Sequence, residues 1–544
     1  MNKALRCVSR ALGAVAIALA VAGASVAQES AHAIPDVPVS LLTRPIGRVA
    51  GIGSAHDPVA TKSADAQAFY DQGNAYLHDY IWVDAARSFN EALRLDPALA
   101  MAHVGLSFAY TELNKPQLAR EALAAAERLA ATANDHDRVR IHLRALQMTA
   151  ESAANSRTAL AAYRTALDEA LTQFPNDGEL WMLRGHAESS DPANRGQGSG
   201  ASSVRFYEKA LSLGATTSEH YLAHAFENSG DEAQALAHAA AFARNAPAVP
   251  HALHMHGHEL RRAGQIEEAI RTFEAADRIN RESLAREAFP PEYDWHYEHN
   301  LDLLGSSYWY VGRVGRASEV LKEAFALPSL LLVQMYNKRT WPEFLIARGR
   351  YDEAAAAGTQ LTTHPVGVVR ALGHIVIGRA RLAAGQLAVA ASESNLALAE
   401  LRAAPGGQEI VAPTMALLQG EFLLKSGQQA RGQEVLRTLV QQISALPGPD
   451  NWVQTLFVLD AIARTAREAN DWEYARWAAS EMIAHDSKYA GGHFALALVA
   501  EHDKNLAEAR RHAAEAERLW SLADADLPER ARLRALGGVS ALAR

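Results

Sequence analysis

The chain has 544 residues, of which 49% are hydrophobic and 21% are charged, and it contains a single cysteine. This composition excludes a disordered polymer and a small disulfide-stapled domain. The 53 Lys and Arg residues are outnumbered by 62 Asp and Glu residues, and no block of five basic residues occurs. A nucleic acid is therefore not an expected partner, because phosphate binding needs a concentrated positive face.

Residues 1–27 have the pattern of a secretory signal peptide. A basic start is followed by an apolar run over residues 11–24, which is too short to cross a bilayer as a helix. Small residues then favour cleavage after Ala27 or, as an alternative, after Ala33. The sequence predicts a periplasmic or secreted protein with no membrane span after cleavage, and its only cysteine is removed with the leader.

Residues 28–63 are rich in Pro, Gly and Ser and show no helical period, so we expect a linker or an extended strap there. Every later segment has a helical pattern. The region from residue 66 to residue 97 spaces large and small apolar residues so that two antiparallel helices can pack closely before a closing proline. These positions are Phe69, Gly73, Tyr76, Ala85, Phe89, Ala92 and Pro97.

This segment resembles the tetratricopeptide (TPR) repeat at all seven signature positions, and looser copies follow at a period near 34 residues. The resemblance implies an all-α fold, a right-handed α-solenoid of about twelve TPR-like helix pairs. We expect an N-terminal array over residues 64–330 and a more degenerate C-terminal array over residues 331–544. A solenoid of this kind leaves an extended concave surface, and a protein or peptide partner in that groove is one expectation.

Two pairs of histidines occupy equivalent places in consecutive repeats. His220 and His224 stand four residues apart, as do His254 and His258, and the two pairs are offset by 34 residues. Residues four apart share a helix face, and packed helices lie about 8–10 Å apart. Four imidazoles can therefore converge on one point.

Further polar residues extend this face. His251 lies one turn before His254, and His299 and Asp302 match His251 and His254 when counted from the next turn glycine. His186 matches the same face in the preceding unit, and Glu227 is a candidate hydrogen-bond acceptor for an imidazole N–H group.

The sequence leaves two interpretations of these histidines. Ligation by nitrogen suits Cu, Zn or Fe and disfavours Mg or Ca, so a site for one or two transition-metal ions is the first. Hydrogen-bonding contacts to a bound peptide are the second. An ion with an open coordination position would activate water or dioxygen, so a metal-dependent oxidoreductase or hydrolase is a further hypothesis.

Several segments together resemble a group of large exported bacterial multi-TPR proteins. That group carries a His-aromatic pair followed by His, an H-x-x-H-M-x-x-H run and a His-Asn-Leu segment, in that order. The matching residues here are His220, His224, His251, His254, His258, His299 and Asn300. The resemblance fades in the last third of the chain and implies no particular chemistry.

Overall fold

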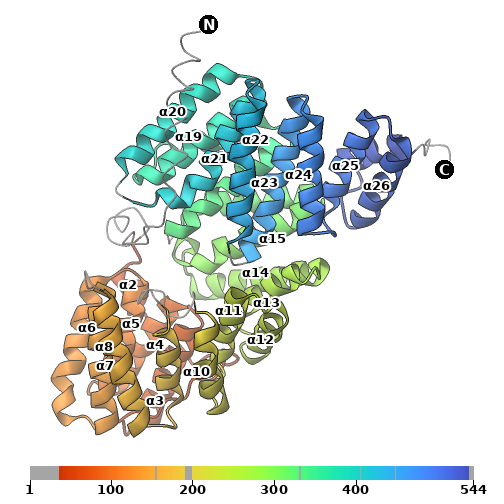
Figure 1. Cartoon of the computed structure of the whole chain (residues 1–544). Coiled ribbons are helices and arrows are strands. Elements are labelled where there is room, and N and C mark those ends of the chain that lie inside the picture. The colour runs from red at the N-terminus through yellow and green to blue at the C-terminus, as the bar shows by residue number, and fades with distance from the viewer. Residues whose placement is uncertain are drawn as a thin grey trace. The chain divides into compact units, whose positions relative to one another are not determined.

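The structure, a computed structural model, describes residues 36–152, 156–189, 199–329, 332–404, 406–446 and 449–537. The predicted signal peptide lies outside the described residues. The described chain divides into two compact units. We call residues 36–289 the amino-terminal unit and residues 290–446 and 450–537 the carboxyl-terminal unit, and each is described by itself (Figure 1).

The amino-terminal unit consists of helices joined by short turns. Their bounds are α2 Val39–Leu42, α3 Ala64–His78, α4 Trp82–Leu95, α5 Ala100–Glu112, α6 Pro116–Leu129, η2 Ala130–Thr132, α7 Asp135–Ser152, α8 Ser156–Gln173, α9 Gly178–His186, α10 Ala201–Ser212, α11 Ser218–Ser229, α12 Glu232–Asn245, α13 Pro250–Arg262 and α14 Ile266–Glu287. From α3 to α14 these helices pack as six consecutive pairs.

The carboxyl-terminal unit has the same construction. Its helices are η4 Pro291–Tyr293, α15 Trp295–Tyr310, α16 Val314–Ala326, η5 Leu332–Arg339, α17 Thr340–Ala347, α18 Tyr351–Leu361, α19 Gly367–Ala383, α20 Leu387–Ala403, α21 Gln408–Lys425, α22 Gln429–Ser444, α23 Pro449–Glu468, α24 Trp472–His485, α25 Ala490–His502, α26 Leu506–Leu519 and α27 Pro528–Gly537. Six further pairs run from α15 to α26, and no strand occurs among the described residues of either unit.

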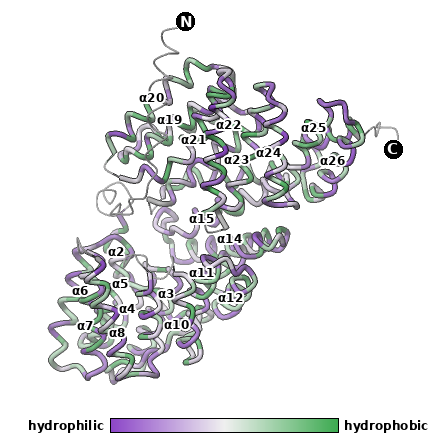
Figure 2. The backbone as a smooth tube through the Cα atoms, in the orientation of Figure 1, coloured by the Kyte–Doolittle hydropathy of each residue, from purple (hydrophilic) through white to green (hydrophobic). Residues whose placement is uncertain are grey.

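The predicted fold class is confirmed: the described residues form an all-α array of twelve helix pairs. Hydropathy alternates along many of the helices, as expected for helices with one buried face (Figure 2). Within a pair, a glycine on the first helix contacts an aromatic ring of the second. A Cβ atom added to Gly73 would lie 2.5 Å from the Phe89 ring, and one added to Gly257 would lie 2.6 Å from the Phe273 ring. Only glycine allows this close approach.

Residues 36–63 lie against the amino-terminal unit. Val37 and Leu42 are buried in it. The main chain is held at one end by Gln72 of α3, whose amide bonds Gly47 and Val49. Two residues after Val49, the carbonyl of Gly51 accepts from the N–H of Ala248, before α13. This segment therefore spans several repeats of the unit.

The boundary between the two units in the chain lies between Phe289 and Pro290. Helix α14 ends at Glu287, and Ala288 takes a left-handed conformation with φ of 46°. Two prolines follow at once and prevent the helix from continuing. Within the described part of the chain, no helix combines the length and the apolar character that a bilayer span requires.

Candidate metal centre

Three histidines of the amino-terminal unit form a buried cluster. His220 and His224 lie on α11, His251 lies on α13, and one ring nitrogen of each lies within 4.8 Å of the others. The Nε2 atoms of His220 and His251 are 3.0 Å apart. The exposed fractions are 0% for His220, 7% for His224 and 3% for His251. We call these three residues the histidine cluster.

Hydrogen bonds orient two of these rings. Nδ1 of His220 lies 2.7 Å from the main-chain carbonyl oxygen of His78. Because a carbonyl only accepts, Nδ1 carries the hydrogen and Nε2 of the neutral ring presents a lone pair. Nδ1 of His224 lies 3.3 Å from the Glu227 carboxylate, so the same tautomer follows. Its Nε2 is buried and has no hydrogen-bond partner among the described residues.

Two more imidazoles continue the row along α13. The Nε2 atoms of His254 and His258 are 2.8 Å apart, and both rings are buried. The ring of His251 lies 5.8 Å from that of His254, with an angle of 22° between the planes. Five imidazoles therefore follow one another on the first helices of two consecutive repeats.

The arrangement differs from the single convergence point expected from the sequence. Equivalent positions of the two repeats are His220 and His254, yet the nitrogen that faces His220 belongs to His251, one turn earlier. The axes of packed helices lie about 8–10 Å apart. Equivalent side chains of consecutive repeats meet over this distance only if the two helices are level with each other along their axes. The stagger between α11 and α13 brings the earlier turn of α13 to His220.

The remaining predicted residues are not members of the histidine cluster. His186, at the end of α9, is half-buried, and its ring lies 4.3 Å from that of Tyr221. His299, Asn300 and Asp302 lie on α15 and so belong to the carboxyl-terminal unit. There, Nδ1 of His299 lies 3.2 Å from the Asn337 amide nitrogen.

Sequence reasoning missed two residues of the α3–α4 turn beside the cluster. His78 holds His220 through its carbonyl and binds Tyr221 and Glu179 through its ring, at 2.8 and 2.9 Å. The ring of Tyr80 lies 4.5 Å from that of His220.

Tyr80 has a left-handed backbone, with φ of 61°. Four equivalent turns place asparagine or glycine in this conformation, namely Asn114, Gly230, Gly264 and Gly312, although the turn between α25 and α26 has Lys504. For a bulky residue this conformation costs about 1–2 kcal/mol. A tyrosine at a position 34 residues before Asn114 was therefore a signal available in the sequence.

A second group of potential ligands lies in the same unit, formed by Asp57, His136 and Asp177. Its centre already holds a cation, because Nη1 of Arg140 lies 3.1 Å from Asp57 and 3.6 Å from Asp177. The two ring nitrogens of His136 face the carboxylates of Asp137 and Asp177, which raise the pKa of His136 to about 9. We call this group, with Arg140, the arginine-centred cluster.

Burial and pairing act in opposite directions on the two aspartates of the arginine-centred cluster. It raises the pKa of Asp57 to about 6, against the lowering effect of Arg140. The pKa of Asp177 is nevertheless held below its usual range by the hydrogen bond to His136 and the charge of Arg140, which outweigh burial. Arg140 and His136 thus already pair with the carboxylates of this cluster.

The described residues define a TPR-type helical repeat protein with a buried row of histidines. No family model matches the sequence, and no curated protein matches it. The chain is similar to the crystal structure of the APC/C hetero-tetramer Cut9-Hcn1, with 11% identity, 88% of this chain and 96% of that chain covered, and a TM-score of 0.30. For the P58(IPK) TPR domain the identity is 12%, the coverages are 84% and 98%, and the TM-score is 0.22. The fold assignment rests on the repeats of the chain itself, and this fold is consistent with a scaffold or protein-interaction role.

Proposed function

We propose that the amino-terminal unit binds a transition-metal ion through His220, His224 and His251. The observation that carries this proposal is the buried Nε2 atom of His224, which lacks a hydrogen-bond partner among the described residues. The ring of His224 also contributes one nitrogen to a group of three imidazole nitrogens. A buried polar atom left without a partner costs about 1–3 kcal/mol, and a metal ion would remove that cost.

The spacing of the nitrogens supports this use. Nitrogen ligands about 2.0–2.1 Å from a tetrahedral zinc ion lie about 3.3–3.4 Å apart. The nitrogens of the cluster span distances from 3.0 Å, between His220 and His251, to at most 4.8 Å. Small side-chain rotations would therefore suffice.

The partners of the rings support it further. Histidines that bind metals usually donate their other N–H group to a carbonyl or a carboxylate. The carbonyl of His78 plays this part for His220, and the carboxylate of Glu227 for His224. Because Nδ1 donates in both bonds, Nε2 of His220 and Nε2 of His224 each carry a lone pair that could bind the ion.

Three neutral nitrogen donors suit Zn, Cu or Fe, and Mg or Ca would require oxygen ligands. The close pair His254 and His258 offers two ligands for a second ion. The contribution of His299 stays a prediction from the sequence. We place the protein in the periplasm or outside the cell, where an ion would be acquired after export. A bound ion with an open position would supply Lewis-acid or redox chemistry.

The test is metal analysis of the chain lacking its predicted leader. The protein is stripped with a chelator, incubated separately with Zn²⁺, Cu²⁺ and, without oxygen, Fe²⁺, desalted and analysed by mass spectrometry for metal content. We expect about one bound ion or more per chain. The double variant His220→Ala, His251→Ala should lose at least one of them with unchanged helicity by circular dichroism.

The matched control replaces two exposed histidines, His56→Ala and His502→Ala, whose side chains are 63% and 45% exposed. This control should bind as much metal as the parent chain. Equal metal content in the parent chain and the His220, His251 variant would contradict the proposal, as would the absence of stoichiometric metal from the parent.

The rival function is a scaffold that binds a protein or peptide and holds no metal. The stacked helix pairs favour it, because such arrays present extended surfaces. Under this proposal the histidines would serve as hydrogen-bonding contacts. Metal-free protein that captures a defined partner, and loses it in the same double variant, would support the scaffold function.

A further inference from the structure

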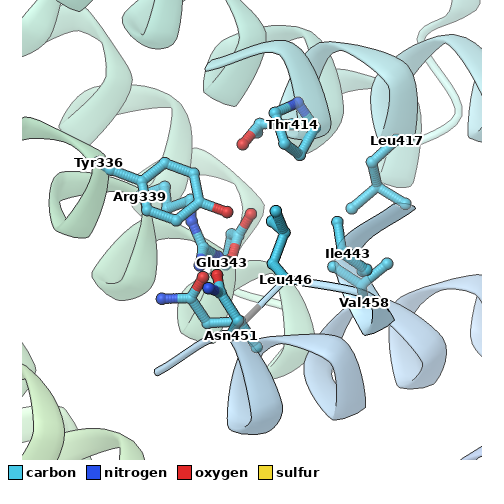
Figure 3. A pocket seen from close by; sticks show the side chains of 11 residues that line it. Tyr336, Arg339, Glu343, Thr414, Leu417, Ile443, Leu446, Asn451 and Val458 are labelled. Carbon is cyan, nitrogen blue, oxygen red and sulfur yellow. Dashed lines mark hydrogen bonds and ion pairs between the residues drawn. The ribbon is translucent and has the colours of Figure 1, made fainter. Parts of the chain in front are cut away.

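The carboxyl-terminal unit contains a cavity that is unrelated to the histidines. It lies between η5, α17, α21, α22 and α23, and the cavity with its mouth encloses about 370 Å³ of space free of protein atoms. Figure 3 shows Tyr336 and Arg339 together on one side, with Leu417, Ile443 and Val458 on the opposite side.

The side chain of Arg339 is buried and only partly paired. It is 2% exposed, and Nη1 donates to the Glu343 carboxylate at 2.5 Å. Nε and Nη2 are buried and have no hydrogen-bond partner among the described residues. The guanidinium carbon lies 4.1 Å from the centre of the Tyr336 ring, which fixes the plane of the group.

A neighbouring arginine shows what a purely structural pairing looks like in this unit. Arg379 is equally buried, and it donates through Nη1 to Glu343 and through Nε and Nη2 to Glu421. Every nitrogen of Arg379 is thus used. Arg339 shares Glu343 with Arg379 but keeps one edge without an acceptor, although a buried charged group without its hydrogen bonds is costly.

The two nitrogens without acceptors form one edge of the guanidinium group. Nε–H and one Nη2–H bond point in parallel, which is the geometry that a carboxylate accepts with both oxygens. From this edge and its cavity we infer that the carboxyl-terminal unit binds a small aliphatic carboxylate, with the carboxylate on Arg339.

The opposite wall defines the rest of the ligand. Leu417, Ile443 and Val458 line it and carry no polar side-chain group. Leu446 also lines the cavity and is 49% exposed, so it lies where the cavity meets solvent. An aliphatic tail would be buried against these side chains, at a gain that grows with its apolar area.

Charge and hydrogen bonding favour a ligand with an amino group. The guanidinium groups of Arg339 and Arg379 pair with the carboxylates of Glu343 and Glu421, and the charge of Asp302 also acts on Arg339, so a simple anion would add to the negative charge here. Oε1 of Gln454, which lines the cavity, is buried and has no hydrogen-bond partner among the described residues. An ammonium group would satisfy this acceptor and offset the negative charge of the ligand's own carboxylate.

The test is isothermal titration of the chain lacking its predicted leader with four compounds. L-Leucine and 4-methylpentanoate share the carboxylate and the tail and differ in the amino group. L-Leucinamide lacks the carboxylate, and glycine lacks the tail. We expect L-leucine to bind most tightly, and L-leucinamide and glycine to bind at least about tenfold more weakly.

The variant Arg339→Lys keeps the charge but removes the two-pronged edge, and it should weaken L-leucine binding by about tenfold or more. Its matched control is Arg381→Lys, an arginine of α19 that is 26% exposed and pairs with Asp352. Tighter binding of 4-methylpentanoate than of L-leucine would identify the acid without an amino group as the preferred ligand. That result would still support a carboxylate site on Arg339. The proposal is overturned if no carboxylate binds, or if L-leucinamide binds as tightly as L-leucine, a result that needs no variant.

Discussion

The amino-terminal unit buries two groups of metal-ligating side chains, and they differ in how their charge is balanced. The histidine cluster presents imidazole nitrogens. The Nδ1–H groups of His220 and His224 donate to the His78 carbonyl and the Glu227 carboxylate. The arginine-centred cluster presents carboxylates that already surround Arg140. Residue types alone would mark both groups as metal sites. The difference is that an internal cation, Arg140, already pairs with the carboxylates of one group, and the metal site that we propose lies in the other.

The largest effect is expected from removing the cation of the arginine-centred cluster. In the variant Arg140→Ala, the buried carboxylates of Asp57 and Asp177 lose their compensating charge. We expect a loss of about 3–5 kcal/mol in the free energy of unfolding, measured by urea denaturation. The control Arg94→Ala removes a side chain that is 64% exposed and should leave the stability unchanged. A small change in the free energy of unfolding in Arg140→Ala would show that Arg140 does not compensate the buried carboxylates of this cluster.

The pH dependence of stability should reveal the same cluster. The pKa of His136 is raised to about 9 by Asp137 and Asp177, above the value of about 6.5 in an unfolded chain. Its contribution is fully present below pH 6.5 and is lost as the pH rises through 9. Burial raises the pKa of Asp57 to about 6, so its protonated form is favoured in the folded state, and that contribution is lost as the pH rises from about 4 to 6.

Urea denaturation at a series of pH values measures this dependence. We expect the stability to fall between pH 6.5 and 9 in the parent chain, and this part of the decline to flatten in the variant His136→Gln. The same slope in both proteins would contradict the assignment of the raised pKa to His136.

The smallest effect concerns the orientation of a ring in the histidine cluster. The variant Glu227→Gln removes the carboxylate that accepts from Nδ1 of His224. We expect metal affinity to fall by about tenfold, measured by competition with a chromogenic chelator. The control Glu232→Gln changes a carboxylate that is 54% exposed and pairs with Arg262, and its affinity should match that of the parent. Unchanged affinity in Glu227→Gln would show that Glu227 does not orient a ligand.

Much of the fold was predictable because it repeats. The spacing of Gly73 and Phe89 describes one helix pair, and the contact between the two residues is the one the repeat pattern predicts. The division between the units at Phe289 was less predictable, because it depends on where α14 stops. The sequence contains prolines at this point, but prolines also occur at many turns within the units.

The candidate site was predictable in its members and not in its contacts. His220 and His224 were paired correctly because both lie on one turn-spaced face of α11. His220 and His251 are 31 residues apart, and their contact depends on how far α11 and α13 are offset along their axes. Similarly, Asp57 and Arg140 are 83 residues apart, and no local pattern relates them.

The sequence by itself determined the helices, their pairing and the face on which each histidine lies, because these follow from periodicities within about 34 residues. Only the tertiary structure decided which imidazoles meet, which carboxylates already hold a cation and which edge of Arg339 lacks an acceptor. Those outcomes depend on distances between helices from different repeats, where a shift of one helical turn exchanges one side chain for another.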